Sequence, residues 1–532
     1  MVASITGQYD WILALTTIFF VFAACSNGAN DVANAYATSV AAKTLEMYQA
    51  GILAAITEFI GAVALGSRVA STIKDDIIGI DRFRGKPGTI MLAMGCAEFG
   101  NASWLTIASL IGFPVSTSQT LVGALVGVGF ASESPVNWGW DSGGIAQIAA
   151  SWGISPAISA CFAAIIFGTV KYSVLNREDS FKWALRLIPV YLAFTGGILA
   201  LFITIEAPTA PSLEAYGIGK IVGIILGVFF ACLLVAYVFF LPYFYRRLVK
   251  QDTRVKFYHI PLGPLLLKDN PPIYFPSKSN EFVINYYEDA YGEVSAGTAK
   301  GGENNGGLAG DPSTSADEKR FAEPQADVER KGDSADSSPE IAPMQKKAKP
   351  GPRERFIGPV KDLPWFNVRK IWGYTKFILL QGVTRDVVSH DSVALRAIHA
   401  RASRYDDRVE HLWTYCQVVS AMLMSIAHGS NDVANAAAPW AVVYRTFQSG
   451  EVNTKAPTPT WFLVIAGILL GAGFWVYGFH IIRVLGNKIT QMSPTRGFSV
   501  ELGAAITVLL ASRLGLPVST TQCTTGAVLG VA

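Results

Sequence analysis

The chain has 532 residues, of which 51% are hydrophobic and only 16% are charged, and its net charge is +3. Soluble domains carry more charge than this, and the mean hydropathy of +0.34 is high, so the composition excludes an ordinary soluble protein. The near balance of charge gives no basis for binding nucleic acid, and the six cysteines show no CxxC pair or metal-ligand spacing.

The first half of the chain contains seven apolar segments. A membrane-spanning helix needs about 20 largely apolar residues, and these segments lack the strict alternation of a β-barrel, so we expect helices. The chain start has no basic region before its apolar run, which predicts a first span and not a removed signal peptide. The segments are 9–26, 47–70, 88–111, 114–131, 144–170, 186–205 and 217–245.

The middle of the chain, 246–408, reads as a cytosolic loop. It opens with Arg246, Arg247 and Lys250, and basic residues next to a span mark the cytosolic side. Its part around 286–352 is rich in Gly, Ser, Pro and charged residues, which predicts disorder. The stretch 365–380, WFNVRKIWGYTKFILL, mixes aromatic and basic residues. It fits an amphipathic helix on the membrane surface, or equally a helix packed on the cytosolic ends of the spans.

Four further apolar segments complete the chain at 409–428, 460–485, 497–514 and 515–532. The predicted fold is therefore an all-α polytopic membrane protein with about 11–12 membrane segments. Counting back from the cytosolic loop places the N-terminus outside. The basic residues of loop 71–87 fit this orientation poorly, although the loop also carries three aspartates.

Two blocks of sequence occur twice in the same order. NGANDVANA at 27–35 matches HGSNDVANA at 428–436, an offset of 401 residues. A second block at 97–128 matches 500–531 at an offset of 403 residues. We infer a duplication, with a first membrane repeat in 1–245 and a second in 409–532. Because the first copy starts outside and the second inside, the repeats are inverted, an architecture typical of secondary transporters with broken or re-entrant helices.

The second block contains GFPVSTSQT in one copy and GLPVSTTQC in the other. Gly-x-Pro ends one helix, and the hydroxyl residues that follow lie where a new half-helix offers unpaired N–H groups and partial positive charge. Such N-termini bind phosphate and similar anions. Ordinary helix capping would explain one copy; the duplication favours a binding site. The candidate phosphate-binding residues are Ser116, Thr117, Ser118, Gln119, Ser519, Thr520, Thr521 and Gln522.

The first block places Asn and Asp residues at membrane depth, where charge is costly. Asn-Gly and Ser-Asn near Gly28 and Gly429 favour a helix break, and carbonyl and carboxylate oxygens suit a hard cation such as sodium. A turn is the alternative for a single copy. An anion site without basic residues also needs cations for charge balance. The candidate residues for sodium and phosphate coordination are Asn30, Asp31, Asn34, Asn431, Asp432 and Asn435.

Three glutamates and one histidine are further candidates. Glu98 and Glu501 are repeated, which favours an ion or gating role over a glutamate at a helix end. Glu58 has no acidic counterpart, and a coupling-ion role and a snorkelling charge stay equally open. His428 replaces Asn27 in the second copy. It could titrate, but a packing role is favoured.

These motifs resemble those of the inorganic phosphate transporter (PiT) family, through GANDVANA at 28–35, GSNDVANA at 429–436 and the paired PVST blocks. FYHIPLGPLLL at 257–267 is similar to the fungal sodium/phosphate symporter branch. The resemblance implies cation-coupled, here sodium-coupled, phosphate uptake at the plasma membrane, and no cofactor or enzymatic activity. The expected partners are phosphate, sodium and the lipid bilayer, with a homodimer left open. Family members usually have about one more span after the last block, which predicts a C-terminally truncated sequence.

Three alternatives stay open at this point. The coupling ion could be the proton, the cargo could be sulfate or arsenate, or the chain could be a phosphate sensor that signals through its cytosolic loop. An enzyme is disfavoured because the sequence offers no nucleophile–base pair, metal signature or nucleotide-binding loop.

Overall fold

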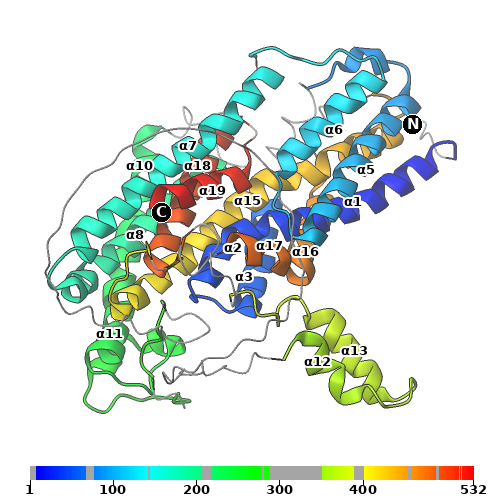
Figure 1. Cartoon of the computed structure of the whole chain (residues 1–532). Coiled ribbons are helices and arrows are strands. Elements are labelled where there is room, and N and C mark those ends of the chain that lie inside the picture. Colours follow the sequence, from blue (N-terminus) through cyan, green and yellow to red (C-terminus); the bar gives the residue numbers. More distant parts are fainter. Residues whose placement is uncertain are drawn as a thin grey trace, which may run out of the picture. The chain divides into compact units, whose positions relative to one another are not determined.

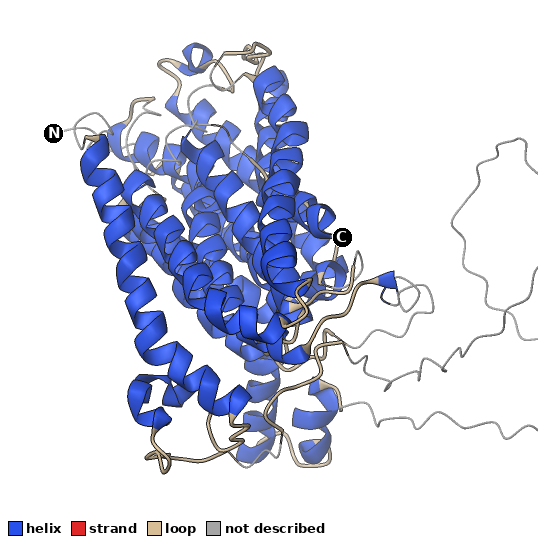
Figure 2. Cartoon of the chain, turned by 90° about the vertical axis from the view of Figure 1, so that its left-hand side faces the viewer, coloured by secondary structure: helices blue, strands red, loops and turns tan. Residues whose placement is uncertain are grey.

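In the computed structural model, the described residues form packed helices and the segments that connect them. Within the described ranges the only β-type pairing is an isolated bridge between Ile78 and Val136 (Figure 2). Most of the segment predicted to be disordered, residues 288–349, lies outside the described residues. The described ranges are 7–66, 77–141, 144–206, 217–277, 281–287, 350–388, 399, 401–452, 458–486, 490–513, 516 and 518–532.

The helices follow the apolar segments of the sequence. The first half contains α1 (Asp10–Asn30), α2 (Val32–Ala41), α3 (Met47–Ile60), α5 (Pro87–Ile111), α6 (Thr117–Ala131), α7 (Ile145–Val170), α8 (Ser180–Glu206) and α10 (Ile218–Val235). The middle contains α11 (Leu241–Phe244), α12 (Pro352–Phe356) and α13 (Val368–Leu380). The last part contains α15 (Asp407–Ser449), α16 (Thr460–Tyr477), α17 (Phe479–Leu485), α18 (Pro494–Arg513) and α19 (Thr520–Val531). Short 3-10 or π turns extend or link several of them, at Gly61–Leu65, Ile80–Phe83, Lys171–Leu175, Ala236–Phe240, Tyr245–Val249, Phe257–Leu267 and Gly358–Val360.

The two repeats match element by element and run in opposite directions. The 401-residue offset pairs α1 and α2 with α15, and the 403-residue offset pairs α5 with α18 and α6 with α19. In Figure 1, α1 and α2 run away from the N-terminus while α15 returns beside them in the opposite sense. This arrangement is the inverted repeat that the sequence predicts.

The half-helices of the second block form as predicted. Gly112 ends α5 in the left-handed conformation, with φ of 74°, which a glycine adopts without strain. After a short non-helical stretch, the Ser116 hydroxyl caps α6 by accepting a hydrogen bond from the backbone N–H of Gln119 at 3.2 Å. Ser519 caps α19 in the same way, accepting from the backbone N–H of Gln522 at 3.3 Å. Both half-helices therefore begin at their hydroxyl residues.

The predicted helix break is wrong for the second Asn–Asp segment and is confined to a single residue in the first. α15 runs without interruption through Gly429, and α1 and α2 are separated only at Asp31, whose backbone is nearly helical with φ of −94° and ψ of −32°. The glycines serve close helix packing instead. A Cβ on Gly28 would lie 1.9 Å from the Leu470 carbonyl oxygen of α16, and one on Gly429 would lie 2.7 Å from the Glu58 carbonyl oxygen of α3. Small residues let membrane helices approach in this way.

Six helices of the described chain are long and apolar enough to cross a membrane, fewer than the predicted 11–12 segments. The difference has a physical cause. α5, α15 and α18 are long but do not meet the criterion, and each buries polar side chains, such as Glu98, Asp432 and Glu501. α6 and α19 are too short to meet it. The six spans are Asp10–Ala41, Met47–Leu65, Ile145–Leu175, Ser180–Thr204, Ile218–Val249 and Thr460–Tyr477.

The two half-helices differ in what covers them. α7 packs along α19, where a Cβ on Gly526 would lie 2.2 Å from the Pro156 carbonyl oxygen. The corresponding glycine of α6 is Gly123, and among the described residues no neighbouring atom comes within 4 Å of the position that a Cβ would take there.

The basic segment after α11 is folded against the bundle. Arg246 is buried, and its Nε donates to Asp252 Oδ2 at 2.9 Å. Hydrogen bonds from Arg254 and Arg246 lower the pKa of the Asp252 carboxyl to about 2. The first part of the predicted cytosolic loop is thus an ordered cap on the helices.

Candidate functional site

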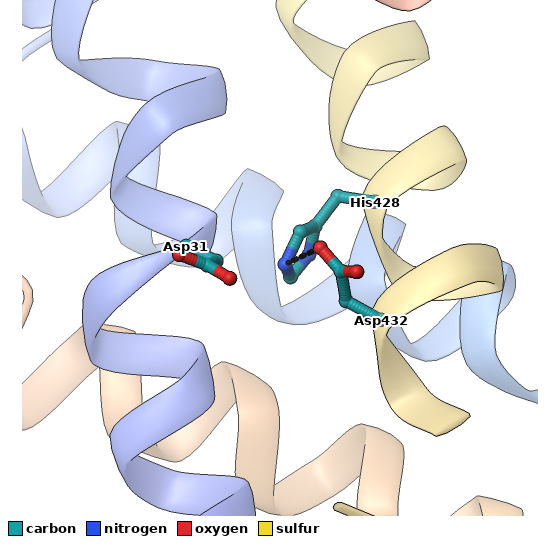
Figure 3. Close-up of side chains that lie close together, drawn as sticks. All are labelled: Asp31, His428 and Asp432. Carbon is teal, nitrogen blue, oxygen red and sulfur yellow. Dashed lines mark ion pairs between the residues drawn. The ribbon is translucent and has the colours of Figure 1, made fainter. Parts of the chain in front are cut away.

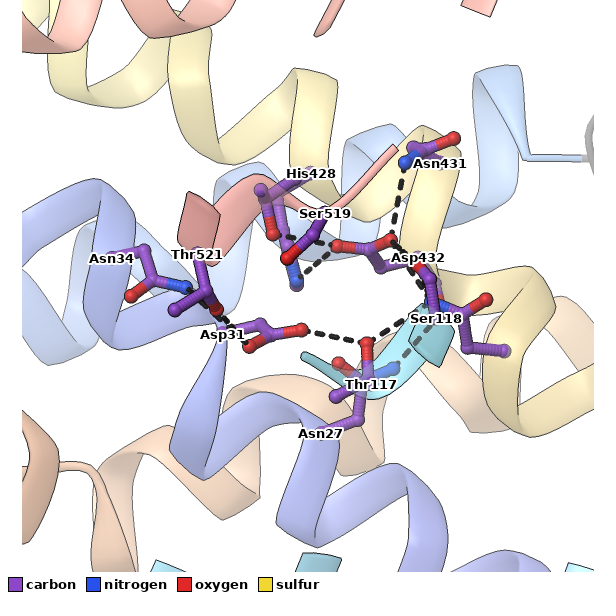
Figure 4. Close-up of polar contacts among 12 residues, drawn as sticks. Asn27, Asp31, Asn34, Thr117, Ser118, His428, Asn431, Asp432, Ser519 and Thr521 are labelled. Atoms are coloured by element: carbon purple, nitrogen blue, oxygen red, sulfur yellow. Dashed lines mark hydrogen bonds and ion pairs between the residues drawn. The ribbon is translucent and has the colours of Figure 1, made fainter. Parts of the chain in front are cut away.

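The two half-helix N-termini meet the Asn–Asp segments in the buried centre of the bundle (Figure 4). Asp31 lies between α1 and α2, and Asp432 lies on α15. Both side chains are almost completely buried. Two carboxylates at this depth require hydrogen-bond donors or cations around them, and their neighbours supply the donors.

Asp31 accepts hydroxyl hydrogen bonds from both repeats. Thr117, at the start of α6 in its own repeat, donates to Oδ2 at 2.6 Å. Thr521, on α19 of the other repeat, donates to Oδ1 at 2.8 Å. The first residue pair lies in one repeat, and the second pair is 490 residues apart in sequence. The carboxylate thus joins the two half-helices.

Asp432 repeats this pattern with the roles of the repeats exchanged. Thr520, at the start of α19 in its own repeat, donates to Oδ2 at 2.9 Å. Ser118, on α6 of the first repeat, lies 3.4 Å from Oδ1 as the crossed donor. Thr117 corresponds to Thr520 and Ser118 to Thr521 at the 403-residue offset. We call these four hydroxyls and two aspartates the crossed hydroxyl–carboxylate cluster.

Asn34 and Asn435 add further hydrogen bonds between the two repeats. Asn34 donates to the Thr521 hydroxyl at 2.7 Å, and Asn435 donates to the Ser118 hydroxyl at 2.9 Å. Asn435 also donates to Asp432 Oδ1 at 2.9 Å, and Asn34 reaches Asp31 Oδ1 at 3.4 Å. Each of these i+3 amides therefore links the aspartate of its own repeat to a hydroxyl of the other.

Asn30 and Asn431 hold the non-helical connections in place. The Asn30 amide donates to the Phe113 carbonyl at 3.1 Å and accepts from the Val115 amide at 3.0 Å. Asn431 donates to Asp432 Oδ1 at 3.1 Å and reaches the Val518 carbonyl at 3.4 Å. Asn30 thus uses both ends of its amide on the protein itself.

Several buried amide oxygens of the site are unpaired. Among the described residues, Oδ1 of Asn27, Asn34 and Asn435 accepts no hydrogen bond. Carbonyl oxygens next to carboxylates are the donor set that hard cations bind. These residues therefore fit a sodium ion by their chemistry as well as by their position.

His428 is a central residue that the sequence interpretation placed in a packing role. Its Nε2 lies 3.2 Å from Asp432 Oδ2, and its Nδ1 lies 2.7 Å from Glu58 Oε2. Ligand atoms of Asp31, His428 and Asp432 all lie within 4.8 Å of one another (Figure 3). The signal that could have found it is its alignment with Asn27, since both positions of the repeated motif face the site.

Glu58 is part of the same buried network. Its Oε1 accepts from the Ser425 hydroxyl at 2.6 Å, and Thr57 donates to Ser425 at 2.7 Å. The Tyr36 hydroxyl lies 2.9 Å from Thr57 Oγ1. Glu58 is completely buried and reaches Asp432 only through His428, which excludes a charge snorkelling to the interface.

Glu501 and Glu98 correspond in sequence but differ in surroundings. Glu501 accepts hydroxyl hydrogen bonds from Thr38, Ser39 and Ser420, each at 2.6 Å. Neither carboxylate oxygen of Glu98 has a partner in the described part of the chain. The sequence contains the reason, because the positions matching Thr38 and Ser39 are a proline and a tryptophan at 439 and 440, which carry no hydroxyl.

A cleft of about 660 Å³ opens onto the half-helix N-termini. Its lining includes Gly123 and Ala124 of α6. Gln119 Nε2 and Gln522 Oε1 are buried there without a partner among the described residues, so both amides are free to bind a ligand. The polar residues that line it are Ser116, Gln119, Thr120, Thr521 and Gln522.

This geometry defines a class of protein: a polytopic membrane transporter whose inverted repeats meet at a central polar site. The chain belongs to the phosphate transporter family, because the model of that family, PHO4, matches residues 27–532. It is therefore a phosphate transporter and not an enzyme.

Individual relatives agree with this assignment. The chain is 36% identical to the phosphate-repressible phosphate permease pho-4 of Neurospora crassa, over 98% of this chain and 91% of the relative. It is 27% identical to sodium-dependent phosphate transporter 1-A of Danio rerio, over 98% of this chain and 89% of the relative. A solved structure named "The sodium-dependent phosphate transporter" has a similar fold, with a TM-score of 0.59, 23% identity, and coverage of 98% of this chain and 89% of that one.

Proposed function

We propose that this chain is a sodium/phosphate symporter of the plasma membrane, with sodium bound at Asp31 and Asp432 and phosphate at the half-helix N-termini. The crossed hydroxyl–carboxylate cluster is the observation that carries the proposal. Two buried carboxylates and a bound phosphate repel one another, so phosphate can enter only when cations neutralise the aspartates. Coupling between the two solutes then follows from the chemistry of the site.

The hydroxyl groups supply the switch. Thr117, Thr521, Ser118 and Thr520 point their hydroxyls at the aspartates, and a hydroxyl has a single proton to donate. A sodium ion on a carboxylate removes the need for that hydrogen bond. The hydroxyls are then free to rotate and donate to phosphate oxygens, so sodium binding creates the phosphate site.

The proposed sodium ligands are the aspartate oxygens together with the unpaired amide oxygens of Asn34 and Asn435. Asn30 and Asn431 hold the connections that position the half-helices. Phosphate meets the N-terminal amides and hydroxyls of α6 and α19, with Gln119 and Gln522 at its entrance. Because every one of these donors is neutral, phosphate is bound weakly enough to leave again.

Uptake of labelled phosphate into vesicles containing the chain tests the ion assignment. We expect uptake to collapse when choline replaces sodium and to stay low as the pH of the choline buffer is lowered. Uptake in choline that increases with acidity would show that the coupling ion is the proton and not sodium. Competition by unlabelled sulfate and arsenate in the sodium buffer tests the cargo, and full competition by sulfate would contradict a site specific for phosphate.

The proposed orientation places the N-terminus outside and the segment after α11 in the cytosol, following its basic residues. An epitope tag placed before Asp10 is then accessible on intact cells. A tag inserted after Gly301 becomes accessible only after permeabilisation. The opposite pattern would invert the orientation without changing the site.

A further inference from the structure

The segment around α13 exposes a continuous apolar surface that belongs to no membrane-spanning helix. Val368, Ile371, Trp372, Ile378 and Leu379 are related by spacings of three, four and seven residues and therefore lie on one side of the helix. Trp365 and Phe366 precede the helix, and all seven side chains are between 55% and 95% exposed. We call these seven residues the α13 apolar face.

This segment is fixed to the bundle at its C-terminal end. The indole N–H of Trp475, near the end of α16, donates to the Leu379 carbonyl at 2.6 Å. A Cβ on Gly382 would lie 2.1 Å from the Trp475 carbonyl oxygen, and Val383 is buried in the main core. The C-terminal end of α13 therefore meets the end of α16, a helix long and apolar enough to span a membrane (Figure 1). The end of such a helix lies near the surface of the bilayer.

The charge of the segment is strongly positive. Residues 350–381 contain six Lys and Arg and two Asp and Glu, a net charge of +4. Arg369 and Lys376 lie beside the apolar face on the helix, with Lys376 Nζ 5.3 Å from the centre of the Trp372 ring. Lys370 Nζ lies 4.5 Å from the centre of the Trp365 ring, but it donates to the carbonyls of Lys361 and Leu363 at 3.1 and 2.7 Å. We therefore assign headgroup binding to Arg369 and Lys376.

We infer that α13 is an interfacial anchor that lays its apolar face into the cytosolic leaflet and binds anionic lipid headgroups through Arg369 and Lys376. Aromatic and aliphatic side chains flanked by cations are the pattern that binds anionic membrane surfaces. The other segment of this chain long enough to reach the face, 288–349, contains no run of large apolar residues and suits it poorly. Through this anchor, the lipid composition of the membrane acts on the end of α16. That helix packs on α1 and α3 of the transport site.

Depth-dependent fluorescence quenching in proteoliposomes tests this inference. The full chain carrying Phe366→Cys is labelled with a polarity-sensitive probe, and the labelled unmodified chain supplies the background of the native cysteines. The vesicles contain acyl-brominated lipid, either with phosphatidylcholine alone or with added phosphatidylserine. We expect strong quenching at position 366 in the anionic vesicles and much weaker quenching in the neutral ones.

Charge reversal supplies the matched controls. Arg369→Glu with Lys376→Glu should shift the bound-to-free ratio in anionic vesicles by roughly 20-fold or more, because each basic residue near such a surface contributes about fivefold. Lys182→Glu, an exposed cation at the start of α8, should leave it unchanged. Phosphate uptake by the same vesicles shows that each variant has folded.

Three results would overturn the inference. Equal quenching in neutral and anionic vesicles would remove the headgroup specificity. No quenching in either would leave the face outside the membrane. Quenching that emerges only after deletion of 288–349 would show that this segment of the chain, and not lipid, covers the face.

Discussion

Asp31 and Asp432 each accept hydroxyls from both repeats, so their charge is the feature on which ion coupling depends. Asp31→Asn and Asp432→Asn should each lower sodium-dependent phosphate uptake by about 10- to 100-fold, since hydrogen bonds to charged groups contribute about 1.5–3 kcal/mol. Uptake is compared in sodium and choline buffers.

The same substitution at the exposed Asp10, on the far end of α1, is the control and should leave uptake unchanged. Wild-type uptake in both site variants would refute the proposed sodium site.

The crossed contacts make a second prediction for pairs of residues. Asp31→Asn and Thr521→Val should be non-additive, with a coupling of about 0.5–3 kcal/mol in the sodium-dependent stabilisation of the purified chain. Thr525→Val is the control, because its hydroxyl donates only to the Thr521 carbonyl within α19. The effect of Thr525→Val should add to that of Asp31→Asn.

Additive effects for Asp31 with Thr521 would mean that the two repeats do not share this carboxylate. The measurement is the shift of the unfolding midpoint over a series of sodium concentrations.

Whether the role of a site residue could be predicted depends on how far apart it and its partner lie in the sequence. The duplication identified Thr117, Thr520 and both aspartates as site candidates from the sequence. It could not indicate that Ser118 and Thr521 bond to the aspartate of the opposite repeat, because those partners are 314 and 490 residues apart. The contact between His428 and Glu58 likewise joins residues 370 positions apart in the sequence.

At the scale of elements, the half-helices and the Asn–Asp helices differ in predictability. Gly-x-Pro and a following hydroxyl residue act locally, so the beginnings of α6 and α19 were correctly predicted. Asn-Gly and Ser-Asn are local signals too, yet α1 continues through Gly28 and α15 continues through Gly429 and Asn431. Close packing against α3 and α16 accounts for the glycines, and packing is not a property of the local sequence.

The unequal cover of α6 and α19 gives a matched test of packing. Gly526→Ala should destabilise the chain by about 1–3 kcal/mol, because the new Cβ would meet the Pro156 carbonyl at 2.2 Å. Gly123→Ala should be neutral or stabilise by about 0.5–1 kcal/mol, because alanine favours a helix where space is open.

The apparent unfolding midpoint, taken at one heating rate in detergent, compares the two variants with the unchanged chain. Equal destabilisation by both would show that the two half-helices are equally enclosed.

At the scale of the whole molecule, deletion of the central loop distinguishes a transporter from a sensor. Deletion of 288–349 should leave phosphate uptake close to the wild-type rate, because every described residue of the site lies outside this segment. Uptake of labelled phosphate, normalised to the amount of protein in the membrane, is the measurement.

A sensor that signals through the loop would lose its signal on the same deletion. Abolished uptake at normal protein levels would show that the loop takes part in transport, and the insertion of a Gly/Ser linker of equal length distinguishes loss of sequence from loss of reach.

The sequence by itself determined the membrane class, the duplication, the inverted orientation of the repeats and the beginnings of both half-helices. Hydropathy, proline geometry and helix capping act over a few residues, so they can be read along the chain. Only the tertiary structure decided which hydroxyl meets which aspartate and which half-helix α7 covers. Those features depend on contacts between residues hundreds of positions apart, and the packing of the two repeats alone brings them together.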